Sequence, residues 1–203
     1  MRLQKYILNE SGIIIHREEN EKTLDNAKRL IHEDCKPYLK LVRSLKKIAV
    51  RMYHYKTEGV DPFFTKAVVR KDRKPVDTNK KLHKAMDDEF QKKFGWRVRS
   101  NGAFTFIWKI SSIGDSIHSI FLPIGKFDYT WSPSVHDTYV DISATKFLNN
   151  DAYRKEVMNS YIMNDGFNKI FNQEVVWRCK YYYLLRFFKI DGRAEELNRI
   201  LDL

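Results

Sequence analysis

A single carboxylate stands at the head of a long β-branched and aromatic segment. Glu174 is followed by Val175-Val176-Trp177 and then by a Tyr-Tyr-Tyr-Leu-Leu run at 181–185. A carboxylate at the rim of a sheet is held rigidly and yet stays reachable from solvent. Glu174 is therefore either a catalytic candidate or a polar residue that begins a strand. No His or second carboxylate at a fixed spacing decides between the two.

Arginines are the second group that could do chemistry. Arg51 ends an apolar segment, and a guanidinium at a strand end can grip a phosphate with two hydrogen bonds. Residues 66–74 carry five basic residues, among them Arg70 and Arg73, against the one acid Asp72. Such a run can hold a pyrophosphate or a nucleic-acid backbone, but an ordinary solvated loop has the same composition.

A third candidate segment is Gly95–Thr105. Its arginines alternate with apolar residues up to Arg99, and a Ser-Asn-Gly turn that begins at Ser100 leads into an aromatic run. The Ser100 hydroxyl can bind a ligand or cap a turn, and capping is the more common role. The six histidines show no metal-ligand spacing, and among them His54 alone lies beside a candidate residue.

Composition limits the class of protein. The 203 residues suffice for one large domain, and 43% hydrophobic residues can form a core. The net charge of +11 predicts an anionic partner, such as a nucleic acid, a nucleotide or an acidic protein surface. Two cysteines fit a reducing compartment. The sequence has no apolar leader and no apolar run of about 20 residues, so we expect neither secretion nor a membrane segment.

Periodicity predicts the elements that position these residues. Helices are expected at 22–44 with a break near Pro37, at 78–94, at 151–171 with an interruption at Asp165-Gly166, and at 193–203. Strands are expected at 48–53, 103–108, 117–122, 127–131 and 174–188. The first 20 residues suggest an arm or hairpin, and 56–77 a loop. This order predicts one α+β domain: helices, then mostly antiparallel strands with helical insertions.

Several segments, taken in order, resemble a family of small bacteriophage proteins related to the ADP-ribosyltransferase superfamily, in its Arg–Ser–Glu branch. The segments that carry the resemblance are 32–39, the strand ending in Arg51, 69–78, 94–104, 120–127, 131–133 and 172–174. The resemblance covers about residues 30–185. It implies an ADP-ribosyltransferase-like core over residues 21–203.

The resemblance also implies roles for individual residues. Arg51 would bind the phosphates of NAD, Ser100 would position the nicotinamide ribose, with Thr105 as the competing choice, and Glu174 would polarise that ribose. A fixed carboxylate beside an oxocarbenium-like cation stabilises the transition state more than the ground state. The basic cleft around NAD would be completed by His54, Arg70, Arg73 and Arg99, and no metal is implied.

Some positions depart from the family pattern, and alternatives therefore stay open. Met52, Phe106 and Asn172 stand where the family has other residues. The implied protein acts in the host cytoplasm or the virion, as a transferase acting on a host macromolecule. The alternative is a non-catalytic virion or nucleic-acid-associated protein of the same fold, and a third interpretation is an inhibitor of an acidic host protein. Convergence of Arg51, Ser100 and Glu174 on one cleft is the geometric test of the transferase interpretation.

Overall fold

In the described part of the chain, ten strands form one sheet, and all of their pairings are antiparallel. The computed structural model describes residues 8–9, 12–16, 24–51, 64–74, 79–109, 119–186 and 193–202. The strands are β1 (Leu8–Asn9), β2 (Gly12–His16), β3 (Lys47–Arg51), β4 (Phe64–Val68), β5 (Ala103–Lys109), β6 (Ser119–Pro123), β7 (Asp128–Trp131), β8 (Ile162–Met163), β9 (Glu174–Arg178) and β10 (Tyr181–Leu185). They lie in the order β1-β2-β4-β10-β6-β3-β5-β9-β7-β8.

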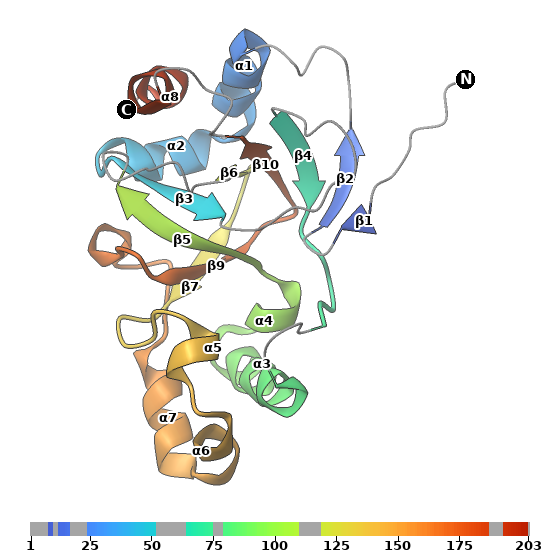
Figure 1. The fold of residues 1–203 in the computed structure, drawn as a ribbon, viewed down its shortest axis with the longest axis vertical. Helices are drawn as coiled ribbons and strands as arrows, with labels where there is room; N and C mark the ends of the chain where they lie inside the picture. The colour runs from blue at the N-terminus through green and yellow to red at the C-terminus, as the bar shows by residue number, and fades with distance from the viewer. Residues whose placement is uncertain are drawn as a thin grey trace.

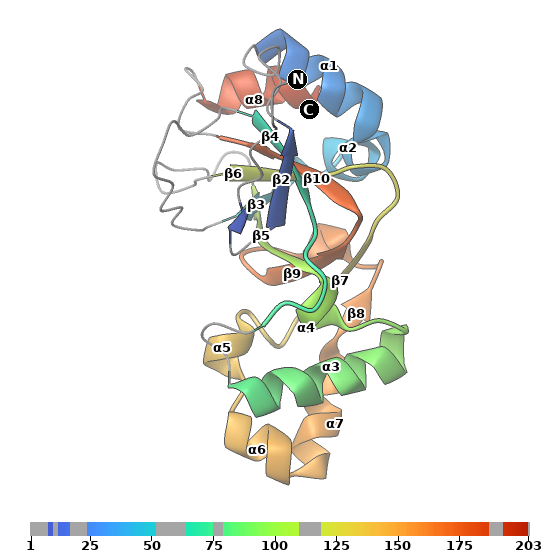
Figure 2. The ribbon, with the colours of Figure 1, turned by 90° about the vertical axis from the view of Figure 1, so that its right-hand side faces the viewer.

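The helices gather in two groups at opposite ends of the sheet (Figures 1 and 2). The first group comprises α1 (Leu24–Asp34), α2 (Lys36–Arg43) and α8 (Arg193–Leu201). The second comprises α3 (Lys80–Phe94), α4 (Val98–Asn101), α5 (Thr138–Asp141), α6 (Ala144–Asn149) and α7 (Asp151–Ser160). The chain is thus a single α+β domain, as the sequence predicts.

Each group of helices packs on its own apolar cluster. The larger cluster joins α1, α2 and α8 to one face of the sheet, where Trp177 contacts the rings of Tyr38 and Phe121. The smaller cluster joins α3, α6 and α7 to Phe104 and Val176. Phe104 and Val176 are register partners on β5 and β9, next to Ala103 and Trp177 of the larger cluster. Since neighbouring residues of a strand point to opposite faces, β5 and β9 separate the two clusters.

The segment after Ser160 differs from the prediction, which was a helix through residue 171 with an interruption at Asp165-Gly166. Helix α7 ends at Ser160, and β8 then pairs with β7 through Met163 and Ile162. Asn164 and Gly166 both have positive φ, at 56° and 68°, which no α-helix tolerates. A 3₁₀ turn at Phe167–Lys169 follows. The helical prediction was therefore wrong beyond residue 160.

Two predictions about strands also need correction. The expected loop at 56–77 contains β4, a short strand that pairs with both β2 and β10. The expected strand from Glu174 to about Phe188 is two strands, because the chain bends at Cys179-Lys180. On one side of the bend β9 lies between β5 and β7, and on the other β10 lies between β4 and β6.

The junction from α3 to β5 positions the candidate residues. Asn79 caps α3 by accepting hydrogen bonds from two backbone N–H groups. Gly95 ends the helix in the left-handed conformation expected for it, with φ of 75°. The predicted turn into β5 is instead a single helical turn, α4. Gly102 follows it, and a Cβ there would lie 2.2 Å from Val176.

Candidate functional site

Glu174 is the first residue of β9 and faces the second group of helices. It is the register partner of Phe106 on β5, and Phe106 is the partner of Val50 on β3. Directly opposed residues point to the same face of an antiparallel sheet. Glu174 therefore lies on the face that also carries Phe104 and Val176, towards α4 and α5.

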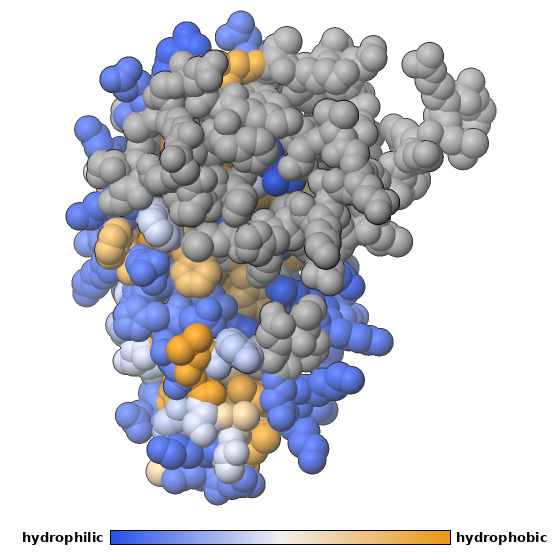
Figure 3. Space-filling model, in the orientation of Figure 1, coloured by the Kyte–Doolittle hydropathy of each residue, from blue (hydrophilic) through white to orange (hydrophobic). Residues whose placement is uncertain are grey.

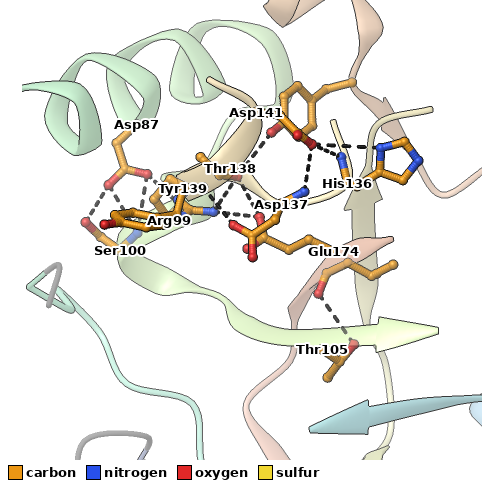
Figure 4. A network of polar contacts seen from close by, with 12 residues as sticks. Asp87, Arg99, Ser100, Thr105, His136, Asp137, Thr138, Tyr139, Asp141 and Glu174 are labelled. Carbon is orange, nitrogen blue, oxygen red and sulfur yellow. Dashed lines mark hydrogen bonds and ion pairs between the residues drawn. The ribbon is translucent and has the colours of Figure 1, made fainter. Parts of the chain in front are cut away.

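The Glu174 carboxylate is held through one oxygen (Figure 4). Its Oε1 accepts hydrogen bonds from Arg99 Nη1 and from Thr138 Oγ1, both at 2.7 Å, and Arg99 Nη1 also lies 2.9 Å from Thr138 Oγ1. Within the described residues Oε2 accepts no hydrogen bond, and the side chain keeps 12% of its surface exposed. The arrangement orients the carboxylate and leaves one oxygen available.

Arg99 reaches Glu174 because Asp87 fixes the helical turn on which it lies. Asp87, 1% exposed, accepts hydrogen bonds from the backbone N–H groups of Arg99 and Ser100, at 2.7 and 3.1 Å. These are two of the N–H groups that a helix start leaves without intrahelical partners. The carboxylate on α3 thus serves as a distant cap for α4, which directs the Arg99 guanidinium towards β9.

Ser100, His83 and Asp87 lie together, but they do not form a nucleophilic triad. A triad places the imidazole between serine and carboxylate, with one ring nitrogen for each. Here His83 Nε2 faces both Ser100 Oγ, at 3.0 Å, and Asp87 Oδ2, at 3.5 Å, while the Ser100 hydroxyl donates directly to Asp87. Burial lowers the pKa of His83, and the positive charge of Arg99 lowers it further against the opposing effect of Asp87. A neutral His83 is consistent with Nε2–H donating to Ser100.

The third group around Glu174 comes from α5. Asp137 caps this short helix and thereby positions Thr138, which is fully buried. The Glu174 N–H donates to the His136 carbonyl at 2.8 Å, so the segment before α5 is fastened to the start of β9. Tyr161, whose hydroxyl lies 3.4 Å from Thr138 Oγ1, has a raised pKa because it is buried and because Glu174 is negative.

Basic side chains border the polar residues around Glu174. The guanidinium groups of Arg73 and Arg99 lie over the ring of Phe104, at 4.8 and 4.5 Å from its centre. The Arg73 N–H donates to the Ser100 carbonyl at 2.9 Å, which ties the segment after β4 to α4. Arg70 is exposed in the same segment. Arg73 and Arg99 therefore meet at Phe104, on the face that carries Glu174.

Arg51 and Thr105 lie on the other face of the sheet. Arg51 follows Val50 and so points away from Glu174, into the larger cluster, where it is 2% exposed and donates to Tyr182 Oη at 2.8 Å. Thr105 is the register partner of Val175, and its hydroxyl accepts a 2.7 Å bond from the Trp177 indole. The structure does not bring Arg51 and Glu174 to one cleft, so the expected convergence of Arg51, Ser100 and Glu174 is absent.

The sequence reasoning missed three residues of this cluster. Thr138 carries no signal beyond the capping Asp137 before it. His83 and Asp87 are four residues apart, a spacing that places two side chains on one helix face and could have drawn attention to them. His54 lies outside the described residues.

Searches for related proteins give no match. No protein-family model, no curated protein and no solved structure matches the chain. Among the described residues, no three His, Cys, Asp or Glu side chains are grouped so that they could hold a metal ion. None of the helices within those residues has the length and apolar character to cross a bilayer.

Proposed function

We propose that the protein binds NAD beside Glu174 and transfers ADP-ribose to an acceptor on a macromolecule. The observation that carries this proposal is the Glu174 carboxylate: Arg99 and Thr138 fix Oε1, and no described residue donates a hydrogen bond to Oε2. A carboxylate with fixed orientation does not have to reorganise as positive charge develops next to it. The resemblance in sequence supports the same chemistry.

The proposed reaction breaks the bond between the nicotinamide nitrogen and C1′ of the ribose. The bonding electron pair leaves with nicotinamide, and C1′ becomes oxocarbenium-like, next to Glu174 Oε2. A lone pair of the acceptor then bonds to C1′, and the acceptor loses its proton to solvent. The negative oxygen stabilises the cation in the transition state, which is where binding energy raises the rate.

Because Arg51 does not converge with Ser100 and Glu174, the proposal does not rest on that triplet, and the arginine roles differ from those implied by the resemblance. Arg51 is buried on the far face, so the pyrophosphate is assigned to Arg73 and Arg70, which follow β4 near α4. Arg99 orients Glu174 through Nη1. The Ser100 hydroxyl is bonded to Asp87 and has a positioning role, in that it stabilises the turn that carries Arg99.

The test measures binding and turnover separately. NAD binding is followed by calorimetry, and transfer by labelling of host lysate with biotinylated NAD. Glu174→Gln should keep NAD affinity within a few-fold and lower turnover on the order of 100-fold or more. Glu156→Gln removes an exposed carboxylate on α7 and should change neither quantity. Absence of NAD binding together with absence of label transfer would overturn the proposal.

One observation favours a second candidate, the non-catalytic protein of the same fold. Arg51 is built into the core through Tyr182, and the expected triplet does not form. This second candidate is supported if the protein binds an anionic macromolecule and does not bind NAD.

A further inference from the structure

A groove of about 1140 Å³ lies on another side of the α3–α4 junction, away from Glu174. Its walls come from the end of β4, the end of α3, the turn between β6 and β7, and the bend between β9 and β10. In Figure 2 these segments lie towards the right of the molecule, whereas α5 lies at the left. None of Glu174, Arg99, Phe104 or Thr138 lines the groove. It is therefore distinct from the proposed NAD site.

Basic residues predominate among the charged residues that line this groove. Five basic residues and one acid contribute to it: Lys71, Arg97, Lys126, Arg178, Lys180 and Asp128. Arg97 lies 3.5 Å from Asp72, and Arg178 lies 3.8 Å from Asp128. Within the described residues, the three lysines have no carboxylate within ion-pair distance. Among the described residues, the groove thus keeps about three charges of one sign that have no ion-pair partner.

The fold itself brings these three lysines together. The Val69 N–H donates to the Lys180 carbonyl at 3.2 Å, which sets the segment carrying Lys71 beside the β9–β10 bend. The Ile124 N–H donates to the Tyr181 carbonyl at 3.0 Å, which sets the turn carrying Lys126 beside the same bend. Like charges gathered from three separate segments repel one another, and a polyanion in the groove would relieve that repulsion.

The groove is better suited to a flexible, extended polyanion than to an enclosed small molecule. Small-ligand sites enclose most of the surface of their ligand, whereas this groove is open to solvent. Here exposed lysines line the walls, and they attract phosphates as flexible point charges without demanding a fixed geometry. Two half-buried aromatic residues also line the groove: Phe127 packs against Tyr38 and Trp177, and the ring of Tyr181 lies 5.0 Å from Lys180 Nζ. The described part of the face that Figure 3 shows mixes hydrophilic side chains with small apolar patches.

We infer that this groove binds single-stranded nucleic acid, with Lys71, Lys126 and Lys180 contacting successive phosphates. Binding of this kind is sequence-tolerant and strongly salt-dependent, because each phosphate contact releases condensed counterions. The inference does not depend on NAD binding at Glu174.

The experiment titrates a fluorescein-labelled thymidine oligonucleotide of about 12 nucleotides with the full chain at several salt concentrations. Fluorescence anisotropy reports the affinity. The double variant Lys126→Gln and Lys180→Gln should bind about tenfold more weakly near 0.1 M salt. Its plot of log affinity against log salt should be shallower by about 1.4, since a single-strand phosphate contact contributes about 0.7.

The matched control is Lys84→Gln with Lys92→Gln, which removes the same charge from the exposed side of α3. The control should retain most of the affinity and the original salt slope. Equal losses in both double variants would show that only net charge matters, and would overturn the assignment of the groove. So would equal competition by pyrophosphate and by the oligonucleotide at the same phosphate concentration, or failure of the wild-type chain to bind at low salt.

Discussion

Charged side chains on the two sides of the α3–α4 junction differ in burial and in pairing. On the Glu174 side, Arg99 is paired at 2.7 Å and Asp87 is bonded to backbone N–H groups, and all these groups are nearly buried. On the groove side, the lysines are exposed and have no carboxylate partner among the described residues. Arg97 and Arg99, two residues apart, belong to different sides. Paired and buried charges fix geometry, whereas unpaired and exposed charges attract a partner.

Removal of the Asp87 carboxylate should have the largest effect on stability. Asp87→Ala leaves buried N–H groups of α4 without an acceptor, so we expect a loss of about 3–5 kcal/mol in the free energy of unfolding. Urea denaturation followed by circular dichroism measures it. Asp88→Ala, next to it but exposed and paired with Lys84, should cost less than about 1 kcal/mol. Similar costs for the two variants would contradict this account of α4.

Breaking the ion pair at Glu174 should have the next largest effect. Arg99→Met leaves a nearly buried carboxylate with one donor fewer, and we expect a loss of about 2–4 kcal/mol. Adding Glu174→Gln to that variant should cost less than the sum of the two single changes, with a coupling of about 1–3 kcal/mol in a double-mutant cycle. The exposed pair Arg29–Glu33 serves as the control cycle, with an expected coupling of about 0.3–0.5 kcal/mol.

The sequence predicts the features that depend on neighbouring residues better than those that depend on contacts between residues far apart in the chain. The α3 helix and its end at Phe94 follow from local periodicity, and the structure confirms both. The position of Glu174 at a strand start also follows from local sequence. Arg51 could not be placed by local sequence, because a shift of one residue reverses the face to which a side chain points. The β4 strand is only five residues long, and its pairing with β10 spans more than 100 residues.

A third way to test the Glu174 side uses pH. The pKa of His83 is lowered by burial, so the folded state resists protonation of this ring more than the unfolded state does. Stability should therefore be complete above the ordinary pKa of about 6.5 and should fall as pH drops from there towards the lowered folded pKa. His83→Gln should flatten this part of the stability curve, measured by urea denaturation at a series of pH values. An unchanged curve would mean that His83 keeps its ordinary pKa in the folded protein.

The smallest effect on stability is expected on the groove side. Lys126→Gln with Lys180→Gln should leave the free energy of unfolding within about 0.5 kcal/mol of wild type, because neither lysine has an ion-pair partner among the described residues. Relief of repulsion favours a slight gain. A loss above 1 kcal/mol on the same urea curve would show that these lysines stabilise the fold, and the contrast between the two sides would then weaken.

The bend at Cys179-Lys180 has a consequence for the order of folding on the ribosome. Both strands that flank it are inserted strands: β9 lies between β5 and β7, and β10 lies between β4 and β6. Without them the sheet is three unconnected pieces, namely β1-β2-β4, β6-β3-β5 and β7-β8. A nascent chain therefore cannot complete the sheet until residues 174–185 have left the exit tunnel. Such late long-range closure is slow, and it leaves strand edges open to chaperones during synthesis.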